Sequence, residues 1–144
     1  MKHAQYFSQL LERYQGAIHD EQLELISLLT DRDMDNLRAA YDWALRNAEF
    51  DIIAQMLDGL FAIYSFRTWL AEGITLFNRT IATLAQHATH GSNGDLTTEQ
   101  ATEAQTALMG KLHVRIGRLL QIMGHHGQSQ EHLAKGFAWA TAQG

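Results

Sequence analysis

Apolar residues recur at intervals of three and four along almost the whole chain, and strict alternation over the length of a strand is not evident. This spacing predicts helices throughout. The apolar positions of the expected helices lie near residues 6–14, 23–29, 37–44, 50–64, 70–84, 108–123 and 133–137. The sequence therefore predicts an all-α fold of about seven helices, joined mostly by short turns.

Two of these stretches predict different surroundings. Between Phe50 and Tyr64 apolar residues surround the helix, which predicts packing on every side. The following helix carries a single apolar stripe.

The stretch "HATHGSNGDLTTEQ" then interrupts the pattern with glycines and predicts one long loop over residues 91–97, with Thr97 and Gln100 resembling a capping box. The acidic run "TDRDMDN" is expected to precede and cap the helix around residues 37–44.

Composition narrows the class of protein. The chain has 144 residues and no proline, which favours long helices, and no cysteine, which excludes disulfides and Cys-based zinc sites. No apolar run approaches the ~18 residues of a membrane helix, and the N-terminus does not resemble a signal peptide. The formal charge of -5 argues against nucleic acid as the main partner. The absence of cysteine also permits a reducing compartment without requiring one.

The stretch "IGRLLQIMGHHGQSQEHL" permits two interpretations, a DNA-reading helix-turn-helix or one unit of a helical repeat. Gly117 and Gly124 are seven residues apart, as in a tetratricopeptide repeat (TPR), where the first glycine marks a close helix approach and the second a turn. Ser129 takes the small position of the second helix and Leu133 the large one. A recognition helix would direct basic or amide side chains at base edges and phosphates, whereas this helix offers Gln128, Gln130, Glu131, His132 and a single lysine, Lys135. The repeat is favoured, with DNA reading as the alternative.

A second unit supports the repeat. Gly59 lies within an apolar helix, and "WLAEGITLFNRTIATLA" follows as the partner helix. The sequence thus predicts one domain over residues 1–144, built of antiparallel helical hairpins in a short TPR-like α-solenoid. Its expected parts are an N-terminal helical cap (1–48), a first hairpin (49–90), a loop (91–97) and a second hairpin (98–144).

The stretch from Met34 to Ala85 also resembles a known family. The matching elements are Asp35-Asn36-Leu37-Arg38-Ala39-Ala40, then Trp43-Ala44-Leu45, then Glu72-Gly73 with Asn78-Arg79. They resemble the start of the helical-repeat region of bacterial STAND-class signal-transduction ATPases and related large transcriptional regulators. Phe66 or Arg67 stands where that region usually has a turn glycine.

The resemblance implies a sensor or interaction segment of a larger cytoplasmic protein, with the ATPase outside this chain. The segment itself lacks a phosphate loop, because "MGKL" has neither the upstream glycine nor the Ser or Thr that such a loop needs. The leading expectation is therefore a non-enzymatic regulatory segment without cofactors.

Candidate catalytic and metal chemistry is weak. "DRDMDN" followed by Asp42 mimics a calcium loop, but Asn36 replaces its turn glycine, so helix capping is the better interpretation. Eight histidines include the pair His87 and His90 and a cluster of three near the last turn, His125, His126 and His132. None has the spacing of a known metal motif, and no serine lies in a nucleophile context. No catalytic residue or metal site is expected.

Binding is expected on the concave face, formed by first helices such as Asp51–Tyr64 and Ala107–Met123. The partner would be a peptide, a neighbouring domain of the parent chain or a small inducer. The basic bias of the Lys111–Arg118 stretch suggests an acidic ligand. The alternatives are a DNA-binding regulator that uses the terminal hairpin and a small-molecule inducer-binding domain. The expected exposed groove residues are Tyr64, Arg67, Lys111, Arg115 and Arg118.

The last helix is expected to bury Leu133 and Phe137 against its partner helix and to direct Trp139 to the opposite side. In a repeat array that side packs on the next unit, and an uncapped solenoid leaves it exposed. Trp139 should therefore be exposed or covered by another copy of the chain, which predicts a weak homodimer through the C-terminal helix.

Overall fold

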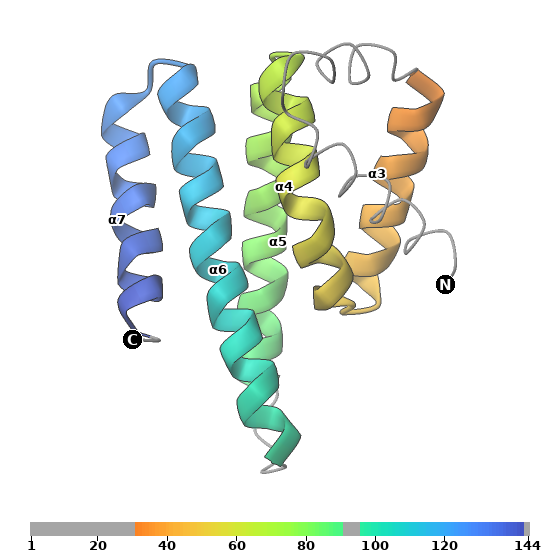
Figure 1. Cartoon of the computed structure of the whole chain (residues 1–144), viewed down its shortest axis with the longest axis vertical. Helices are drawn as coiled ribbons and strands as arrows, with labels where there is room; N and C mark the ends of the chain where they lie inside the picture. The colour runs from red at the N-terminus through yellow and green to blue at the C-terminus, as the bar shows by residue number, and fades with distance from the viewer. Residues whose placement is uncertain (1–30, 91–95, 143–144) are drawn as a thin grey trace. The chain divides into compact units, whose positions relative to one another are not determined.

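The computed structural model describes residues 31–90 and 96–142, which form five helices and no strand. The all-α class is thereby confirmed. The first two expected helices fall in residues 1–30, outside the described residues, so the count of about seven helices and the solenoid arrangement stay predictions. Figure 1 shows the helices, which are α3 (Asp31–Arg46), α4 (Phe50–Phe66), α5 (Leu70–His90), α6 (Leu96–Ile122) and α7 (His126–Ala142).

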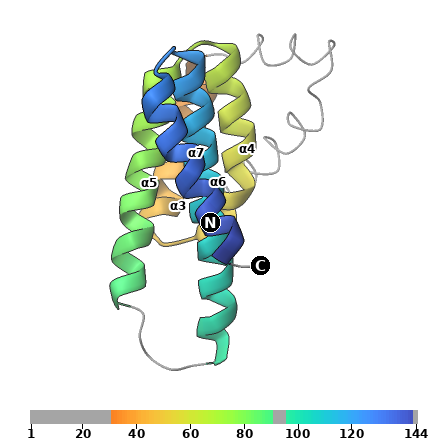
Figure 2. The same ribbon diagram turned by 90° about the vertical axis from the view of Figure 1, so that its left-hand side faces the viewer.

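The chain divides into two compact units, residues 1–69 and residues 70–144. In the first unit α3 packs on α4, and in the second α6 packs on both α5 and α7. Figure 2 shows α5 and α6 running side by side in opposite directions. The boundary between the units lies inside the expected first hairpin (49–90).

The acidic run before the third expected helix is itself helical. Helix α3 begins at Asp31, so the expectation that this run precedes the helix is wrong. Asp31 and Asp33 lie in the first turn, where carboxylates interact favourably with the positive end of the helix dipole. Asp35 forms an ion pair of 3.1 Å with Arg38 in the next turn. Because these acidic residues are helical, they do not form the loop that the calcium-loop pattern requires.

Helix α4 is packed on most sides, as its apolar pattern predicts. Its buried residues recur through every turn, and a narrow exposed strip contains Asp51 and Gln55. Gly59 is among the buried residues of this helix.

Three helix-to-helix turns share one backbone geometry. Each has a residue with positive φ, namely Ala48 (54°), Thr68 (58°) and Gly124 (86°). In each turn the amide of the next residue donates to the carbonyl five residues earlier, as in Glu49 N to Ala44 O at 2.9 Å. This pattern is the Schellman motif, which ends a helix and satisfies its last carbonyl groups. Gly124 has the turn role that its spacing predicts.

The turn between α4 and α5 shows which residue takes the place of the usual glycine. Thr68 carries the positive φ, one residue beyond the positions expected from the family pattern. Its neighbour Trp69 lies under two guanidinium groups, that of Arg38 at 5.6 Å and that of Arg67 at 5.2 Å from the ring centroid. Cation–π contacts of this kind are attractive. The contact from Arg38 therefore holds this turn against α3.

Helix α6 begins one residue before the expected capping box. Because the helix starts at Leu96, Thr97 is helical and does not take the cap position, and the expected loop 91–97 does not extend over residues 96 and 97. Residues 91–95 lie outside the described residues.

Candidate functional site

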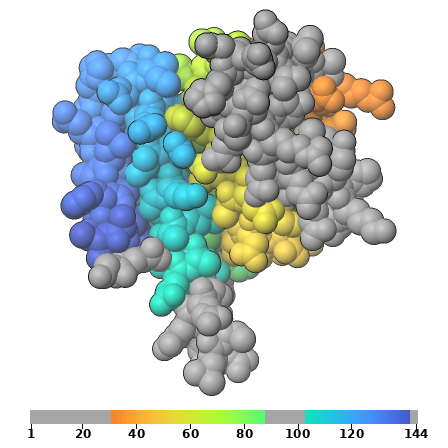
Figure 3. All heavy atoms as spheres, in the orientation of Figure 1, coloured from red at the N-terminus to blue at the C-terminus, as the bar shows by residue number. Residues whose placement is uncertain are grey.

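Helices α6 and α7 approach each other closely along a line of small residues, here called the seam: Gly110 and Gly117 on α6, Ser129 and Gly136 on α7. A β-carbon added at Gly136 would lie 3.0 Å from the carbonyl oxygen of Gly110. One added at Gly117 would lie 3.2 Å from the carbonyl oxygen of Ser129. The two antiparallel contacts are seven residues apart on both helices. Figure 3 shows the resulting close contact, with the surfaces of α6 (cyan) and α7 (blue) against each other.

A buried hydrogen bond fixes the upper end of the seam. The Ser129 hydroxyl donates to the Gly117 carbonyl oxygen at 2.8 Å, and Ser129 is almost fully buried. A buried hydroxyl without a partner would cost about 1–3 kcal/mol, so this bond fixes the register of the two helices. Ser129 thus has the small-residue role that the repeat pattern assigns to it.

Two histidines meet on one side of the seam, here called the histidine side. The Nδ1 atoms of His113 and His132 are 3.1 Å apart while their ring centroids are 5.3 Å apart, so the two nitrogens lie between the rings and face each other. One Nδ1–H donates to the lone pair of the other Nδ1, which requires at least one of the rings to be neutral.

The same surroundings keep His113 neutral. Burial lowers the pKa of His113 to about 4, with further contributions from the nearby charges of His132 and Lys135. Burial and Lys135 also lower the pKa of His132, whereas Glu131 acts in the opposite direction. At neutral pH the pair is therefore a neutral polar contact beside the seam. His132 contacts His113 instead of forming a cluster with His125 and His126.

The large apolar residues of α7 lie beside the seam. Phe137 is 71% exposed, so the expectation that it is buried against α6 is wrong. The buried face of α7 is formed instead by the small residues Ser129 and Gly136, and Leu133 is partly buried beside Gly117. Trp139 is 37% exposed, consistent with the expectation of exposure, and lies seven residues after His132 on the histidine side.

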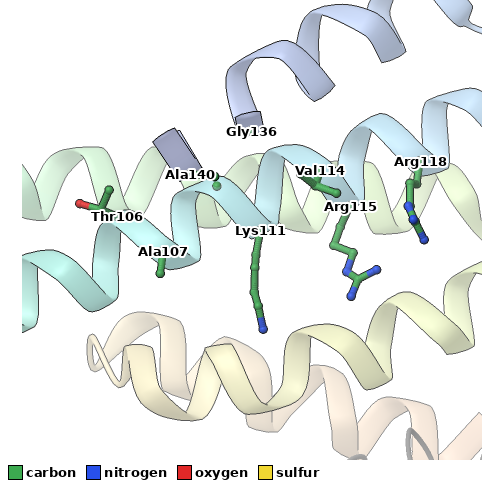
Figure 4. Close-up of a pocket in the computed structure, with 9 residues that line it drawn as sticks. Thr106, Ala107, Lys111, Val114, Arg115, Arg118, Gly136 and Ala140 are labelled. Atoms are coloured by element: carbon green, nitrogen blue, oxygen red, sulfur yellow. The ribbon is translucent and has the colours of Figure 1, made fainter. Parts of the chain in front are cut away.

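The other side of the seam, here called the groove side, carries an open pocket of about 420 Å³. Lys111, Arg115 and Arg118 are spaced four and three residues apart, so they share one face of α6. Figure 4 shows all three side chains extending from the same side of that helix. Among the described residues that line the pocket none is acidic; they are Thr106, Ala107, Gly110, Lys111, Val114, Arg115, Arg118, Gly136 and Ala140.

The structure thus brings together three of the five groove residues expected from the sequence. Tyr64 is fully buried, so its expected exposure is wrong: it lies on the apolar inner face of α4. Arg67 contacts the Trp69 ring. Both belong to the unit of residues 1–69, whereas the three cations belong to the unit of residues 70–144.

Among the described residues, no group of three or more potential metal-binding side chains comes together. Within the same ranges no helix combines the length and apolarity that a bilayer crossing requires.

The sequence interpretation identified Gly117 and Ser129 but missed Gly110 and Gly136. A signal for them was present, because Gly110 precedes Gly117 by seven residues and Gly136 follows Ser129 by seven. In an antiparallel pair, two small positions with equal spacing on both helices indicate a close contact that continues over two turns.

No protein-family model, curated protein or solved structure matches the chain. The site must therefore be interpreted from its own geometry.

Gly136→Ala should weaken the α6–α7 packing. The added β-carbon would lie 2.6 Å from Val114 Cγ2 and 3.0 Å from the Gly110 carbonyl oxygen. The first atom belongs to a stiff β-branched side chain and the second to the backbone, so neither moves aside easily. We expect the free energy of unfolding to fall by about 1–2 kcal/mol in urea denaturation. Gly127→Ala is the matched control on the same helix, because nothing lies within 4 Å of its added β-carbon. The control should be as stable as the wild type or up to about 1 kcal/mol more stable. Equal stability of both variants would contradict the close approach.

Acid should destabilise the protein through His113. The unfolded chain protonates this side chain near pH 6.5, whereas the folded protein does so near pH 4. Protons therefore favour the unfolded state between these values, and stability present above pH 6.5 is lost as the pH falls. We expect the free energy of unfolding to decrease by about 2 kcal/mol between neutral pH and pH 4.5. His113→Leu should show a flatter profile in the same urea titrations, and an unchanged pH dependence in that variant would refute the assignment.

Proposed function

We propose that the chain is a non-enzymatic interaction and regulatory segment of a cytoplasmic bacterial signal-transduction ATPase or transcriptional regulator. Its TPR-like hairpins would receive a protein or peptide, which includes neighbouring domains of the parent chain. The resemblance of residues 34–85 to the helical-repeat region of such proteins supports the context. The local geometry of α6 and α7 supports the repeat, because Gly117 lies at a close helix approach and Gly124 at the turn.

The observation that carries the proposal is the groove beside the seam. It combines small and apolar residues with three cations on one helix. The exposed Phe137 belongs to the same side of α7, because it lies between Leu133 and Ala140 at intervals of four and three residues. Apolar side chains exposed beside a groove are typical of surfaces that bind another polypeptide.

One observation favours a second candidate, a small-molecule inducer. The volume of about 420 Å³ lies within the range of about 300–1,000 Å³ that small-molecule pockets occupy. In that case the groove would bind a compact small molecule, and a peptide would not bind more tightly than such a molecule.

Filling the groove should abolish peptide binding. Ala140 and Ala138 are both exposed alanines of α7, but only Ala140 lines the groove. Peptides selected on the wild type from an unbiased random library should bind Ala140→Trp at least about tenfold more weakly. Their affinity for Ala138→Trp should stay unchanged. The readout is fluorescence anisotropy of the labelled peptides.

The proposal fails if the selection yields no binders, or if the selected peptides bind Ala140→Trp as well as they bind the wild type. Binding of small drug-sized compounds that Ala140→Trp blocks, with no peptide binding, would favour the second candidate.

We also propose weak self-association through α7 on its histidine side. The partly exposed Trp139 is the side chain that would pack against a second copy. Sedimentation velocity over a wide concentration range should show a dimer for the wild type and a monomer for Trp139→Glu. Ala138→Glu, which adds the same charge at the neighbouring exposed position, should still dimerise. A wild type that stays monomeric throughout, or dimers that persist in Trp139→Glu, would exclude this contact.

A further inference from the structure

The groove specifies the chemistry of its partner. We infer that it binds an acidic amphipathic peptide, in which carboxylates meet Lys111, Arg115 and Arg118 and one apolar side chain rests beside Phe137. This inference depends on the proposed function, because it names the class of partner for the same groove.

Charge is the first argument. The three cations follow one face of α6 over about 10 Å, because a helix rises 1.5 Å per residue. Lys111 and Arg118 are exposed and Arg115 is partly exposed. Three cations thus gather on one face of a single helix, although the chain as a whole carries a formal charge of -5. A local cationic face on an acidic protein attracts an acidic ligand and disfavours a basic one.

The apolar part of the groove is the second argument, and it separates a peptide from a nucleic acid. Ala107, Val114 and Ala140 line the groove next to the cations. Phe137 is exposed, and its spacing of three residues from Ala140 places it on the same side of α7. A phosphate backbone has no apolar side chain to place there, whereas a peptide does. Three cations are also few for duplex binding, in which the affinity comes mainly from neutralising many phosphates.

The spacing of the cations suggests the conformation of the partner. Carboxylates spaced four and three residues apart on a helical peptide would repeat the spacing of Lys111, Arg115 and Arg118. An apolar residue next to that stripe would then lie toward α7 and Phe137. Arginine adds planar, paired hydrogen bonds to a carboxylate, which gives the two arginine positions more directional recognition than a lysine would.

The test uses three synthetic helical peptides that differ only in the charged stripe: glutamate, glutamine or lysine at the same three positions, with one leucine kept in all. The wild type should bind the glutamate peptide at least about tenfold more tightly than the glutamine peptide and should not bind the lysine peptide. Raising the salt concentration from about 0.05 to 0.5 M should reduce this preference. Fluorescence anisotropy gives the affinities.

Charge reversal locates the effect. Arg118→Glu should weaken binding of the glutamate peptide about tenfold or more. Lys135→Glu makes the same change in net charge on α7 at an exposed position that does not line the groove, so it should leave the affinity unchanged. Circular dichroism of both variants checks that they fold, and a Lys111→Glu variant repeats the test if Arg118→Glu does not fold.

Each other outcome overturns the inference. If the glutamine peptide binds as tightly as the glutamate peptide and Ala140→Trp abolishes both, the groove is an interaction site without acidic preference, and the proposed function stands alone. If Lys135→Glu weakens binding as much as Arg118→Glu, the charge effect does not come from the groove. If a random-sequence DNA duplex binds more tightly than the glutamate peptide and competes with it, the cations recognise phosphate. If no peptide binds, the acidic partner is excluded, and the library selection decides the proposed function separately.

Discussion

The close approach of two helix backbones at the seam is the constraint on which the rest of the α6–α7 hairpin depends. Gly110 and Gly136 meet at one point and Gly117 and Ser129 at another, with no room for larger side chains between them. Protein interiors are packed near crystal density, so a β-carbon added at Gly136 or Gly117 fits only if the atoms of the facing helix give way. Separation would break the hydrogen bond from Ser129 to the Gly117 carbonyl, which spans only 2.8 Å.

The seam also determines what lies on either side of it. Because its residues are small, the larger side chains of α7 occupy the two flanks, and Phe137 becomes exposed beside the groove instead of buried against α6. His113 and Val114 are consecutive residues of α6, so they lie on opposite sides of the Gly110–Gly117 line. One begins the histidine side, and the other lines the groove.

The sequence predicted the five described helices because apolar spacing determines which residues face a core. It also identified Gly117, Gly124 and Ser129, whose roles follow from their spacing. It placed turns close to Ala48 and Thr68 but did not identify these two residues as the turn residues, because both adopt positive φ without being glycine, and the hydrogen bonds of the turn override their local preference. Phe137 was misplaced for a different reason: hydrophobicity marks a residue as apolar, but only the contact between Gly110 and Gly136 shows which face of α7 is occupied.

The candidate site was predictable to the extent that it lies on one helix. Lys111, Arg115 and Arg118 share a face of α6 by periodicity alone, so the sequence was sufficient to group them. Tyr64 and Arg67 belong to a different unit, and their surroundings depend on tertiary packing: one is buried within an apolar face and the other lies on the Trp69 ring. The histidine pair needed contacts between helices in the same way, since His113 and His132 are nineteen residues apart. The pair and the groove lie on opposite sides of one seam. Protonation of both histidines would place two N–H groups against each other at 3.1 Å, so acid opposes the contact between the two rings.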